Sequence, residues 1–318
     1  MDFQVSTAKP NAHQNVPIAT GRFAPSPTGD LHIGNLRTAL VAWLFARTSG
    51  GSFTVRMEDL DRVTSSAEHA ASQLNDLEML GLDWDGEVVF QSDRFDRYFA
   101  AIDQLTAAGL TYPCFCSRRE IAEAASAPHE HLPEGAYPGT CRDLTETQRS
   151  ERYAERGKAA LRLRADHTRI RFEDVICGSI VATVDDFVLR RADGVPAYNL
   201  AVVVDDAAQH VEEVVRADDL LLSTPRQIHL GQLLHFPALS YAHIPLVVST
   251  AGVRLAKRDG AVTLKERLAG GNSAGEVLSM LARSLGMAAA GEAIQLDDLL
   301  YRFDPDALPK DPWMFDPQ

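Results

Sequence analysis

Apolar and polar residues alternate with two different periodicities along the first hundred residues. In residues 53–57 every second position is apolar, which is the period of a β-strand, and the apolar stretch 21–26 predicts another strand. In residues 36–46 apolar side chains recur on one face at helical spacing, and similar spacing predicts amphipathic helices over 66–80 and 94–108. Strands that alternate with helices predict an α/β fold with a parallel sheet covered by helices.

The alternation of predicted strands and helices stops at about residue 111. From there to about 193, short arginine-rich pieces mix with β-like runs such as "SIVATVDDFVL", which predicts an insertion. The strand and helix alternation resumes in "AYNLAVVVDDAAQ" and "VEEVVRADDL", and from residue 273 we expect helices to the end of the chain. The first twenty residues lack a basic segment followed by an apolar one, so we expect a flexible tail over 1–20 rather than a signal peptide.

Composition and charge narrow the class of protein. The chain has 318 residues, of which 45% are hydrophobic and 24% charged, and no apolar run approaches the length of a membrane span. Four cysteines favour a reducing compartment, so we expect a cytoplasmic protein without a membrane partner. The net charge of −13 argues against nucleic-acid binding, but residues 142–171 hold nine Arg or Lys against five Asp or Glu. A polyanion site or a solvated helix face would explain this local excess equally well.

Candidate chemistry begins at "PSPTGDLHIGN", where a loop leads from a strand into a helix. A helix N-terminus offers N–H groups and a positive dipole end, which suit a phosphate. His32 and Gly34 stand where the chain can approach such a ligand, although an ordinary loop with a chance histidine would look the same. Much later, "VRLAKRDGAV" carries Lys257, a cation able to stabilise charge at a reacting phosphate.

The cysteines suggest a metal. Cys114 and Cys116 form C-x-C, and Cys141 ends a Y-x3-C segment after a short gap. Zinc prefers four tetrahedral ligands, so three thiolates leave one place, for which His129 and His131 are the usual residue types. Cys177 stands apart, and we expect it to be a small buried hydrophobic residue.

Four motifs together resemble one family. "PSPTGDLHIGN" resembles the HIGH-type signature of class I aminoacyl-tRNA synthetases in its glutamyl form, and "RLAKR" resembles their KMSKS-type loop. "VRMEDLDR" and "DGVPAYNLAVVVDD" are similar to the acidic segment and the amino-acid pocket helix of the glutamyl enzymes. Asn35 takes the fourth place of the first motif, and Arg254 and Ala256 replace a lysine and a serine of the second. The resemblance implies a Rossmann-like catalytic domain over 21–271.

Length and cysteine spacing point to one branch. Only 47 residues follow 271, where full glutamyl-tRNA synthetases carry an anticodon-binding region, so we expect 272–318 to be a short helical region without one. This resembles the glutamyl-queuosine tRNA(Asp) synthetases, which attach glutamate to queuosine in the anticodon of tRNA(Asp). That resemblance implies a Zn²⁺ site in the insertion 111–193, with Tyr137 joining Cys114, Cys116 and Cys141. We also expect a monomer.

The resemblance also assigns the residues that bind the substrates. L-glutamate would bind to Arg22, Phe23, Ala24, Pro25, Ser26, Glu58, Tyr198 and Arg216. ATP, with Mg²⁺, would bind to His32, Gly34, Asn35 and Lys257. Of these, His32 and Lys257 would be catalytic: His32 and the helix amides after Gly34 would hold the phosphates, and Lys257 would stabilise the pentavalent phosphorus. Arg22 would bind the side-chain carboxylate of glutamate and Glu58 its ammonium.

The reaction would form glutamyl-adenylate without tRNA and then transfer glutamate to the queuosine of tRNA(Asp). Three other functions stay open from the residues. One is a shortened glutamyl-tRNA synthetase that charges the 3′ end of tRNA(Glu). The others are an adenylyltransferase for a small metabolite and a non-catalytic RNA-binding module.

Overall fold

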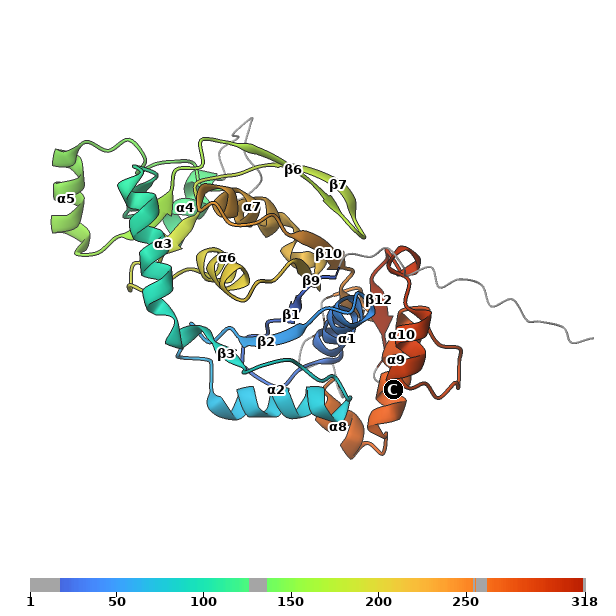
Figure 1. Cartoon of the computed structure of the whole chain (residues 1–318). Coiled ribbons are helices and arrows are strands. Elements are labelled where there is room, and N and C mark those ends of the chain that lie inside the picture. Colours follow the sequence, from blue (N-terminus) through green and yellow to red (C-terminus); the bar gives the residue numbers. More distant parts are fainter. Residues whose placement is uncertain (1–17, 126–135, 254, 256–261, 317–318) are drawn as a thin grey trace, which may run out of the picture.

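The computed structural model describes residues 18–125, 136–253, 255 and 262–316. In this part of the chain, seven strands form one sheet in the order β3-β2-β1-β9-β10-β6-β7, with β7 antiparallel to β6 and the other neighbours parallel (Figure 1). The strands are β1 (Gly21–Phe23), β2 (Phe53–Met57), β3 (Val89–Phe90), β6 (Arg169–Asp174), β7 (Gly178–Thr183), β9 (Glu213–Ala217) and β10 (Ser240–Ile244). The predicted parallel α/β sheet is confirmed.

Helices cover both faces of the sheet, and each face has its own hydrophobic core (Figure 1). One core holds α1 (Ile33–Thr48), α2 (Ala67–Met79), α8 (Leu264–Ala269), α9 (Ala274–Ser284) and α10 (Leu296–Arg302). The other holds α3 (Phe95–Ala107), α6 (Tyr198–Ala208) and α7 (Thr224–Leu233). No helix of the described residues is long and apolar enough to span a membrane.

Helix α1 differs from the one-faced helix that its spacing predicts. Its side chains from Ile33 to Ala46 are buried on nearly all sides. The physical reason is that the sheet lies on one side of α1 while α9 and α10 pack on another. Even Arg37 is buried there, and it donates hydrogen bonds to the carbonyl of Pro245 at 2.8 Å and to Ser284 Oγ at 3.1 Å.

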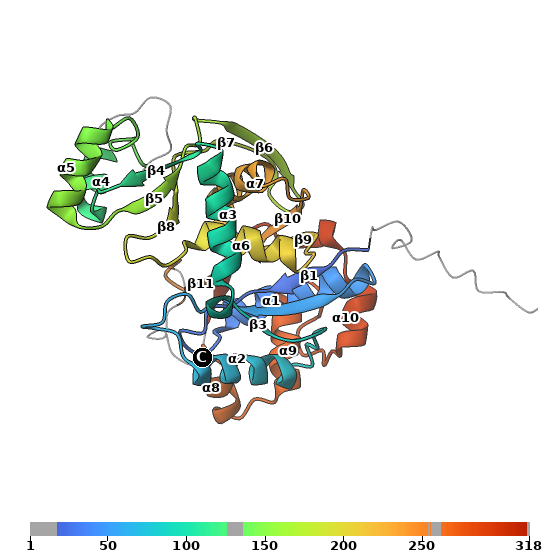
Figure 2. The same ribbon diagram turned by 60° about the vertical axis from the view of Figure 1, so that its left-hand side comes forward.

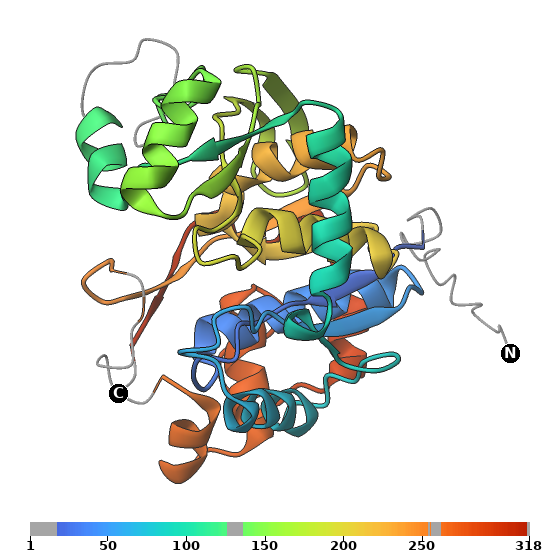
Figure 3. The same ribbon diagram turned by 90° about the vertical axis from the view of Figure 1, so that its left-hand side faces the viewer.

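The segment from 111 to 193 contributes to two sheets. One is a separate antiparallel sheet of β4 (Thr111–Cys114), β5 (Ala160–Leu163) and β8 (Val188–Arg190), flanked by α4 (Arg118–Ala125) and α5 (Glu146–Arg156). It lies at the opposite end of the molecule from α9 and α10 (Figures 2 and 3). The hairpin of β6 and β7 instead extends the main sheet, since Asp174 of β6 pairs with Tyr241 of β10.

The turn of that hairpin holds Cys177, which we expected to be buried. Cys177 is exposed, because the chain reverses direction between β6 and β7 and the side chain lies at the turn. The interpretation of Cys177 as a buried hydrophobic residue is therefore wrong.

The C-terminal region is not helical to its end. After α10 the chain forms β12 (Trp313–Phe315), which pairs in parallel with β11 (Val247–Ser249). Aromatic residues favour strands, and Phe315 is buried in the same core as α1 while its neighbour Met314 is exposed. The prediction of helices from residue 273 is confirmed for α9 and α10 and wrong for these last residues.

Candidate functional site

The carboxyl ends of β1, β2 and β9 surround a cavity of about 550 Å³. Ligands of open parallel sheets bind at this edge. Residues 22–26, Glu58, Tyr198 and Arg216, which the sequence assigns to the amino-acid pocket, all line this cavity, together with His32 and Asn35. Gly34 is not among its lining residues, and Lys257 falls outside the described residues, as do Arg254 and Ala256.

Beneath the cavity lies a cluster of buried charges. Arg56, on β2, is fully buried, and its Nη1 donates to Asp206 Oδ1 at 2.7 Å. Its Nη2 reaches Glu58 Oε1 at 3.4 Å, and its Nε lies 3.9 Å from Asp205. Arg22 shares the same Asp206 oxygen, with its Nε at 3.3 Å, and its Nη1 donates to the carbonyl of Val215 at 3.2 Å.

These contacts set the charges of the cluster. Burial would raise the pKa of Asp206, but the guanidiniums of Arg56 and Arg22 outweigh burial, so its pKa lies below the ordinary value. For Glu58 the balance is the reverse: burial raises the pKa of its carboxyl, and the same two arginines offset only part of that effect. The two carboxyl groups of the cluster therefore differ: the charged form is favoured for Asp206 and disfavoured for Glu58.

Sequence reasoning missed Arg56 and Asp206. They lie inside the motifs "VRMEDLDR" and "DGVPAYNLAVVVDD". Arg56 stands on the polar phase of its alternating strand, so the spacing gave no sign of burial there, whereas Asp205 and Asp206 follow a run of three valines in a buried helix. A charged residue in such a position needs a buried partner.

Arg216 lies at the far side of the cavity, at the end of β9. Its Nη1 points to the hydroxyl of Tyr198 at 3.5 Å, its Nη2 donates to Thr224 Oγ1 at 2.8 Å, and its Nε donates to His243 Nε2 at 3.0 Å. Burial and the nearby Glu58 raise the pKa of Tyr198, so its phenol keeps its proton. The cavity therefore presents guanidiniums from two sides, together with the carboxyl groups of Glu58, Asp30 and Asp219. The two guanidiniums suit an amino acid with an acidic side chain.

The N-terminus of α1 forms the other wall. His32 is its N-cap: Nδ1 accepts from the Asn35 amide at 3.2 Å, and Asn35 Oδ1 accepts from the His32 amide at 3.2 Å. A Cβ on Gly34 would lie 2.9 Å from the His32 ring, so the glycine makes room for that ring. The amide of Leu36 donates to the carbonyl of His32. The amides of Asn35 and Leu36 thus have partners within the cap and the helix, and the use of the amides after Gly34 for phosphate stays a prediction.

The loop that holds Lys257 is bounded by two residues near this wall. The carbonyl of Val262 accepts from the amide of Ile33, the first residue of α1, at 2.7 Å. Leu255, on the other side of the loop, is buried in the same core and its amide approaches the carbonyl of Val247. The described ends of this loop thus lie beside the helix that His32 caps.

The "PSPTG" loop is fixed by a residue that sequence reasoning also missed. Gln73, on α2, is buried, and its amide nitrogen donates to the carbonyls of Ser26 at 3.1 Å and Gly29 at 2.7 Å. The Glu58 amide donates to the carbonyl of Pro25 at 2.9 Å. The loop's own carbonyls are therefore satisfied by α2 and β2, which fixes the course of the chain at the cavity wall.

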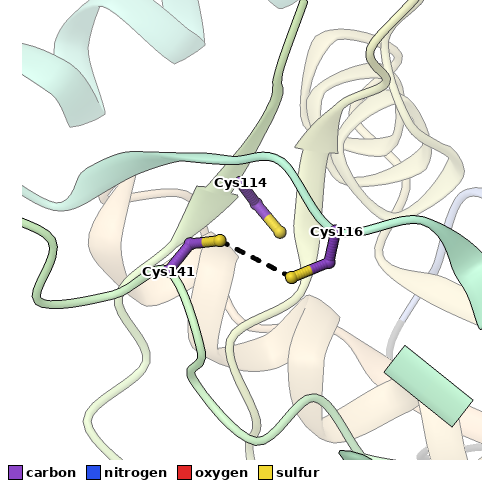
Figure 4. Close-up of side chains that lie close together, drawn as sticks. All are labelled: Cys114, Cys116 and Cys141. Carbon is purple, nitrogen blue, oxygen red and sulfur yellow. Dashed lines mark hydrogen bonds between the residues drawn. The ribbon is translucent and has the colours of Figure 1, made fainter. Parts of the chain in front are cut away.

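A second cluster lies in the small sheet. The sulfur atoms of Cys114, Cys116 and Cys141 all lie within 4.8 Å of one another, and Figure 4 shows their side chains converging. The hydroxyl of Tyr137 lies 3.4 Å from Cys114 Sγ and 3.8 Å from Cys116 Sγ, and it accepts the Cys141 amide at 2.8 Å. His129 and His131, the alternative ligands, fall outside the described residues.

This donor set fits a tetrahedral zinc ion. Zn–S bonds of about 2.3 Å in a tetrahedron place the sulfur atoms about 3.8 Å apart. The sulfurs of Cys116 and Cys141 are 3.5 Å apart, near that spacing. The guanidinium of Arg162 stacks 3.7 Å from the centre of the Tyr137 ring. Burial and the neighbouring Cys114 raise the pKa of the Tyr137 phenol, and the Cys141 amide offsets only part of that effect.

The comparison with known proteins decides the family. The family model described as "tRNA synthetases class I (E and Q), catalytic domain" matches residues 18–318. A protein of Nocardia farcinica called glutamyl-Q tRNA(Asp) synthetase is 58% identical over 294 residues, which are 92% of this chain and 92% of the relative. This chain belongs to the glutamyl-Q tRNA(Asp) synthetase family. Like its class I relatives, it is a ligase-type enzyme.

Other relatives agree. The glutamyl-Q tRNA(Asp) synthetase of Cutibacterium acnes is 52% identical over 86% of this chain and 78% of the relative. A solved glutamate tRNA ligase from Elizabethkingia meningosepticum, in complex with its amino acid, superposes with a TM-score of 0.80. That structure is 26% identical and covers 94% of this chain and 67% of its own. The class I fold that the motifs predicted is thus confirmed.

The buried charges give a first prediction. Replacing Arg56 with Met removes the cation and leaves buried carboxylates without a partner, so unfolding should become easier by about 3–5 kcal/mol. Because the pKa of Asp206 is lowered in the folded protein, its pairing contributes stability above the ordinary pKa of aspartate and loses it as the pH falls. Urea unfolding at neutral pH and at about pH 3, below the ordinary aspartate pKa of about 3.9, should therefore show the larger loss at neutral pH.

The control for this prediction is Arg119→Ala, because Arg119 pairs with Glu123 on the surface of α4 and its side chain is 84% exposed. That variant should change stability by about 0.5 kcal/mol or less. Equal effects of the two substitutions would contradict the importance of the buried cluster.

Proposed function

We propose that this enzyme activates L-glutamate with MgATP and transfers the glutamyl group to queuosine in the anticodon of tRNA(Asp). One observation carries the proposal: the cavity combines Arg22, Arg216 and Glu58 in a chain 58% identical to a named glutamyl-Q tRNA(Asp) synthetase. These two cations and this anion complement the two carboxylates and the ammonium of glutamate, and Asp30 and Asp219 also line the cavity.

Arg22 binds the side-chain carboxylate of glutamate in this proposal. Arginine has five N–H donors, and Arg22 uses two of them on Asp206 and Val215. The remaining donors are enough for a carboxylate to bind to two of them at once. Since Asp206 and Val215 hold the guanidinium in place, glutamate does not have to order it.

Glu58 receives the ammonium of glutamate. Burial raises the pKa of Glu58, so its charged form is disfavoured in the empty site. An ammonium group beside the carboxyl favours the charged form. Tyr198 and Arg216 complete the pocket from the opposite wall. A neutral side chain, such as that of glutamine, would leave the guanidinium of Arg22 without its anion, which favours glutamate over glutamine.

ATP binds along the wall formed by α1, with His32 next to the phosphates and Gly34 leaving room for the His32 ring. Because His32 Nδ1 accepts the Asn35 amide, the neutral ring carries its proton on Nε2 and can donate it to a phosphate oxygen. Lys257 supplies the cation that stabilises the pentavalent α-phosphorus as the α-carboxylate of glutamate attacks and pyrophosphate leaves. The described ends of its loop, beside α1, support this role.

Activation needs no tRNA in this proposal. The arginines and the "PSPTG" loop are held by hydrogen bonds within the protein, from Asp206, Val215 and Gln73. A site that is already assembled without RNA does not require RNA binding to form.

The acceptor is a hydroxyl of queuosine, which attacks the carbonyl carbon of glutamyl-adenylate and releases AMP. The names of the relatives support this acceptor. An anticodon loop is single-stranded, which is the form of RNA that proteins usually recognise by sequence. Of the basic residues of 142–171, the exposed Lys158, Arg169 and Arg171 supply cations for its phosphates. Arg162 is buried, and Arg142, Arg152, Arg156 and Arg164 lie in ion pairs.

Zinc is the structural cofactor that we propose for the small sheet. Cys114, Cys116, Cys141 and Tyr137 would hold it, and as a closed four-ligand site it would connect β4 with the segment before α5.

The zinc site gives the second prediction. Cys116→Ser should lose most of the bound metal in elemental analysis, because a serine hydroxyl does not ionise to replace a thiolate. Tyr137→Phe should weaken zinc at least about tenfold in chelator competition if the phenol is a ligand. Cys177→Ser, in the exposed turn, is the control and should keep one zinc per chain. Full zinc in Cys116→Ser would place the metal elsewhere.

Glu58 gives the third prediction. Because its pKa is raised, protonation should remove the anion that faces the ammonium at a higher pH than for an ordinary glutamate. The KM for glutamate in pyrophosphate exchange should therefore rise as the pH is lowered from neutral. Glu58→Gln should have a high KM at every pH and lack this rise. Asp61→Asn, at an exposed carboxylate, is the control and should behave like the wild type.

The proposed acceptor is tested by charging with labelled glutamate. Queuosine-containing tRNA(Asp) should accept glutamate, whereas unmodified tRNA(Asp) and tRNA(Glu) should not. A queuosine-containing tRNA(Asp) that lacks its 3′-terminal adenosine should still accept it. If the trimmed tRNA fails, or if tRNA(Glu) is charged, the enzyme acts as a shortened glutamyl-tRNA synthetase.

A further inference from the structure

We infer that Asp174 and His243 are positioning residues that fix the Arg216 guanidinium for the substrate, an inference that rests on the proposed function. Neither lines the cavity, and sequence reasoning singled out neither. Asp174 ends β6 and His243 lies on β10, so the pair connects the substrate pocket to the hairpin of β6 and β7.

The contact between His243 and Arg216 determines a tautomer. Arg216 Nε is a donor in every state, so His243 Nε2, at 3.0 Å, has to accept. A neutral histidine that accepts at Nε2 carries its proton on Nδ1. Nδ1 lies 2.6 Å from Asp174 Oδ2 and donates a hydrogen bond to it. The order of donation is therefore Arg216 to His243 to Asp174.

Asp174 is itself held in place. Its Oδ1 accepts from the backbone amides of Ile176 at 3.0 Å, Cys177 at 2.9 Å and His243 at 3.2 Å. Its Oδ2 is thereby directed at the imidazole. Both side chains, Asp174 and His243, are fully buried. The carboxylate therefore has separate tasks for its two oxygens, one in the hairpin turn and one toward the site.

A charged His243 would oppose the arrangement. Burial lowers the pKa of His243, and the neighbouring Arg216 guanidinium lowers it further, while the hydrogen bond to Asp174 works in the opposite direction. The neutral imidazole keeps its acceptor toward Arg216. With Thr224 holding Nη2, two sides of the guanidinium are bound within the protein, and its Nη1 side stays directed to Tyr198 and the cavity.

This arrangement removes the freedom of a long side chain before the substrate arrives. A guanidinium that is already oriented loses less conformational entropy on binding, which strengthens glutamate binding without a new contact. A purely structural role, in which the pair only joins β6 to β10, predicts no selective effect on glutamate.

The test begins with Asp174→Asn. If the asparagine oxygen accepts the same backbone amides as Asp174 Oδ1, its NH₂ group points at His243 Nδ1. Nδ1 must then accept a hydrogen bond, so the imidazole proton moves to Nε2. There it faces the Nε–H of Arg216, and the hydrogen bond between the two residues is lost. The loss of a hydrogen bond to a charged group should raise the KM for glutamate about tenfold or more in pyrophosphate exchange. The KM for ATP should change less than about twofold, since the ATP wall does not contact this pair.

A matched pair at His243 separates the acceptor from mere volume. His243→Gln can offer an amide oxygen to Arg216 Nε, whereas His243→Leu cannot. The KM for glutamate should rise strongly in His243→Leu, and in His243→Gln it should lie much closer to the wild-type value. In an Arg216→Gln background, adding Asp174→Asn should raise the glutamate KM less than about threefold, because the effect acts through Arg216.

Imidazole ¹⁵N NMR tests the inference without an activity assay, because it reports which nitrogen of His243 carries the proton. The spectrum should show His243 neutral with its proton on Nδ1, and in Asp174→Asn the proton should be on Nε2. Additive KM effects in the double variant, equal KM values for Gln and Leu at position 243, or an Nε2–H tautomer in the wild type would overturn the inference. Wild-type enzyme without glutamate-dependent exchange would instead overturn the proposed function, whatever tautomer the spectrum shows.

Discussion

One carboxylate oxygen, Asp206 Oδ1, accepts hydrogen bonds from both Arg56 and Arg22 at the base of the cavity. Removing these charges from water is costly, and the cost is offset only while every partner is present. Asp206 lies on α6, Arg22 on β1 and Arg56 on β2, so the ion pairs hold one helix to two strands at the base of the cavity. The pocket and the packing of the sheet therefore depend on the same buried pairs.

This arrangement explains how a cavity rich in charge can be ready for its ligand. Arg22 is held by Asp206, and Arg216 by Thr224 and His243, so the two cations are oriented by the protein. Glu58 differs from Asp206, because burial raises its pKa and the two neighbouring arginines offset only part of that effect. In the proposed function, the ammonium of glutamate would favour its charged form.

Motifs and periodicity predicted much of this protein. The strands and helices around β1 and β2 followed from local apolar spacing, because each strand or helix shows its own periodicity. Arg22, Glu58 and the three clustered cysteines were found because they stand in short motifs of fixed spacing. Predictions from local spacing were wrong where contacts with distant parts of the chain decide whether a side chain is buried. Cys177 lies in an exposed turn, and the chain after α10 ends in a strand because Phe315 enters the main core.

The sequence by itself determined the family, the alternation of strands and helices around β1 and β2, and the motif residues that line the cavity and form the cysteine cluster. The tertiary structure alone decided which charges are paired. Arg56 meets an aspartate 150 residues away, and His243 meets Asp174 across 69 residues. No local pattern encodes such a pairing, because it depends on which strands become neighbours in the sheet. Burial then makes the pairing necessary, since an unpartnered charge in the interior costs more free energy than the fold can supply.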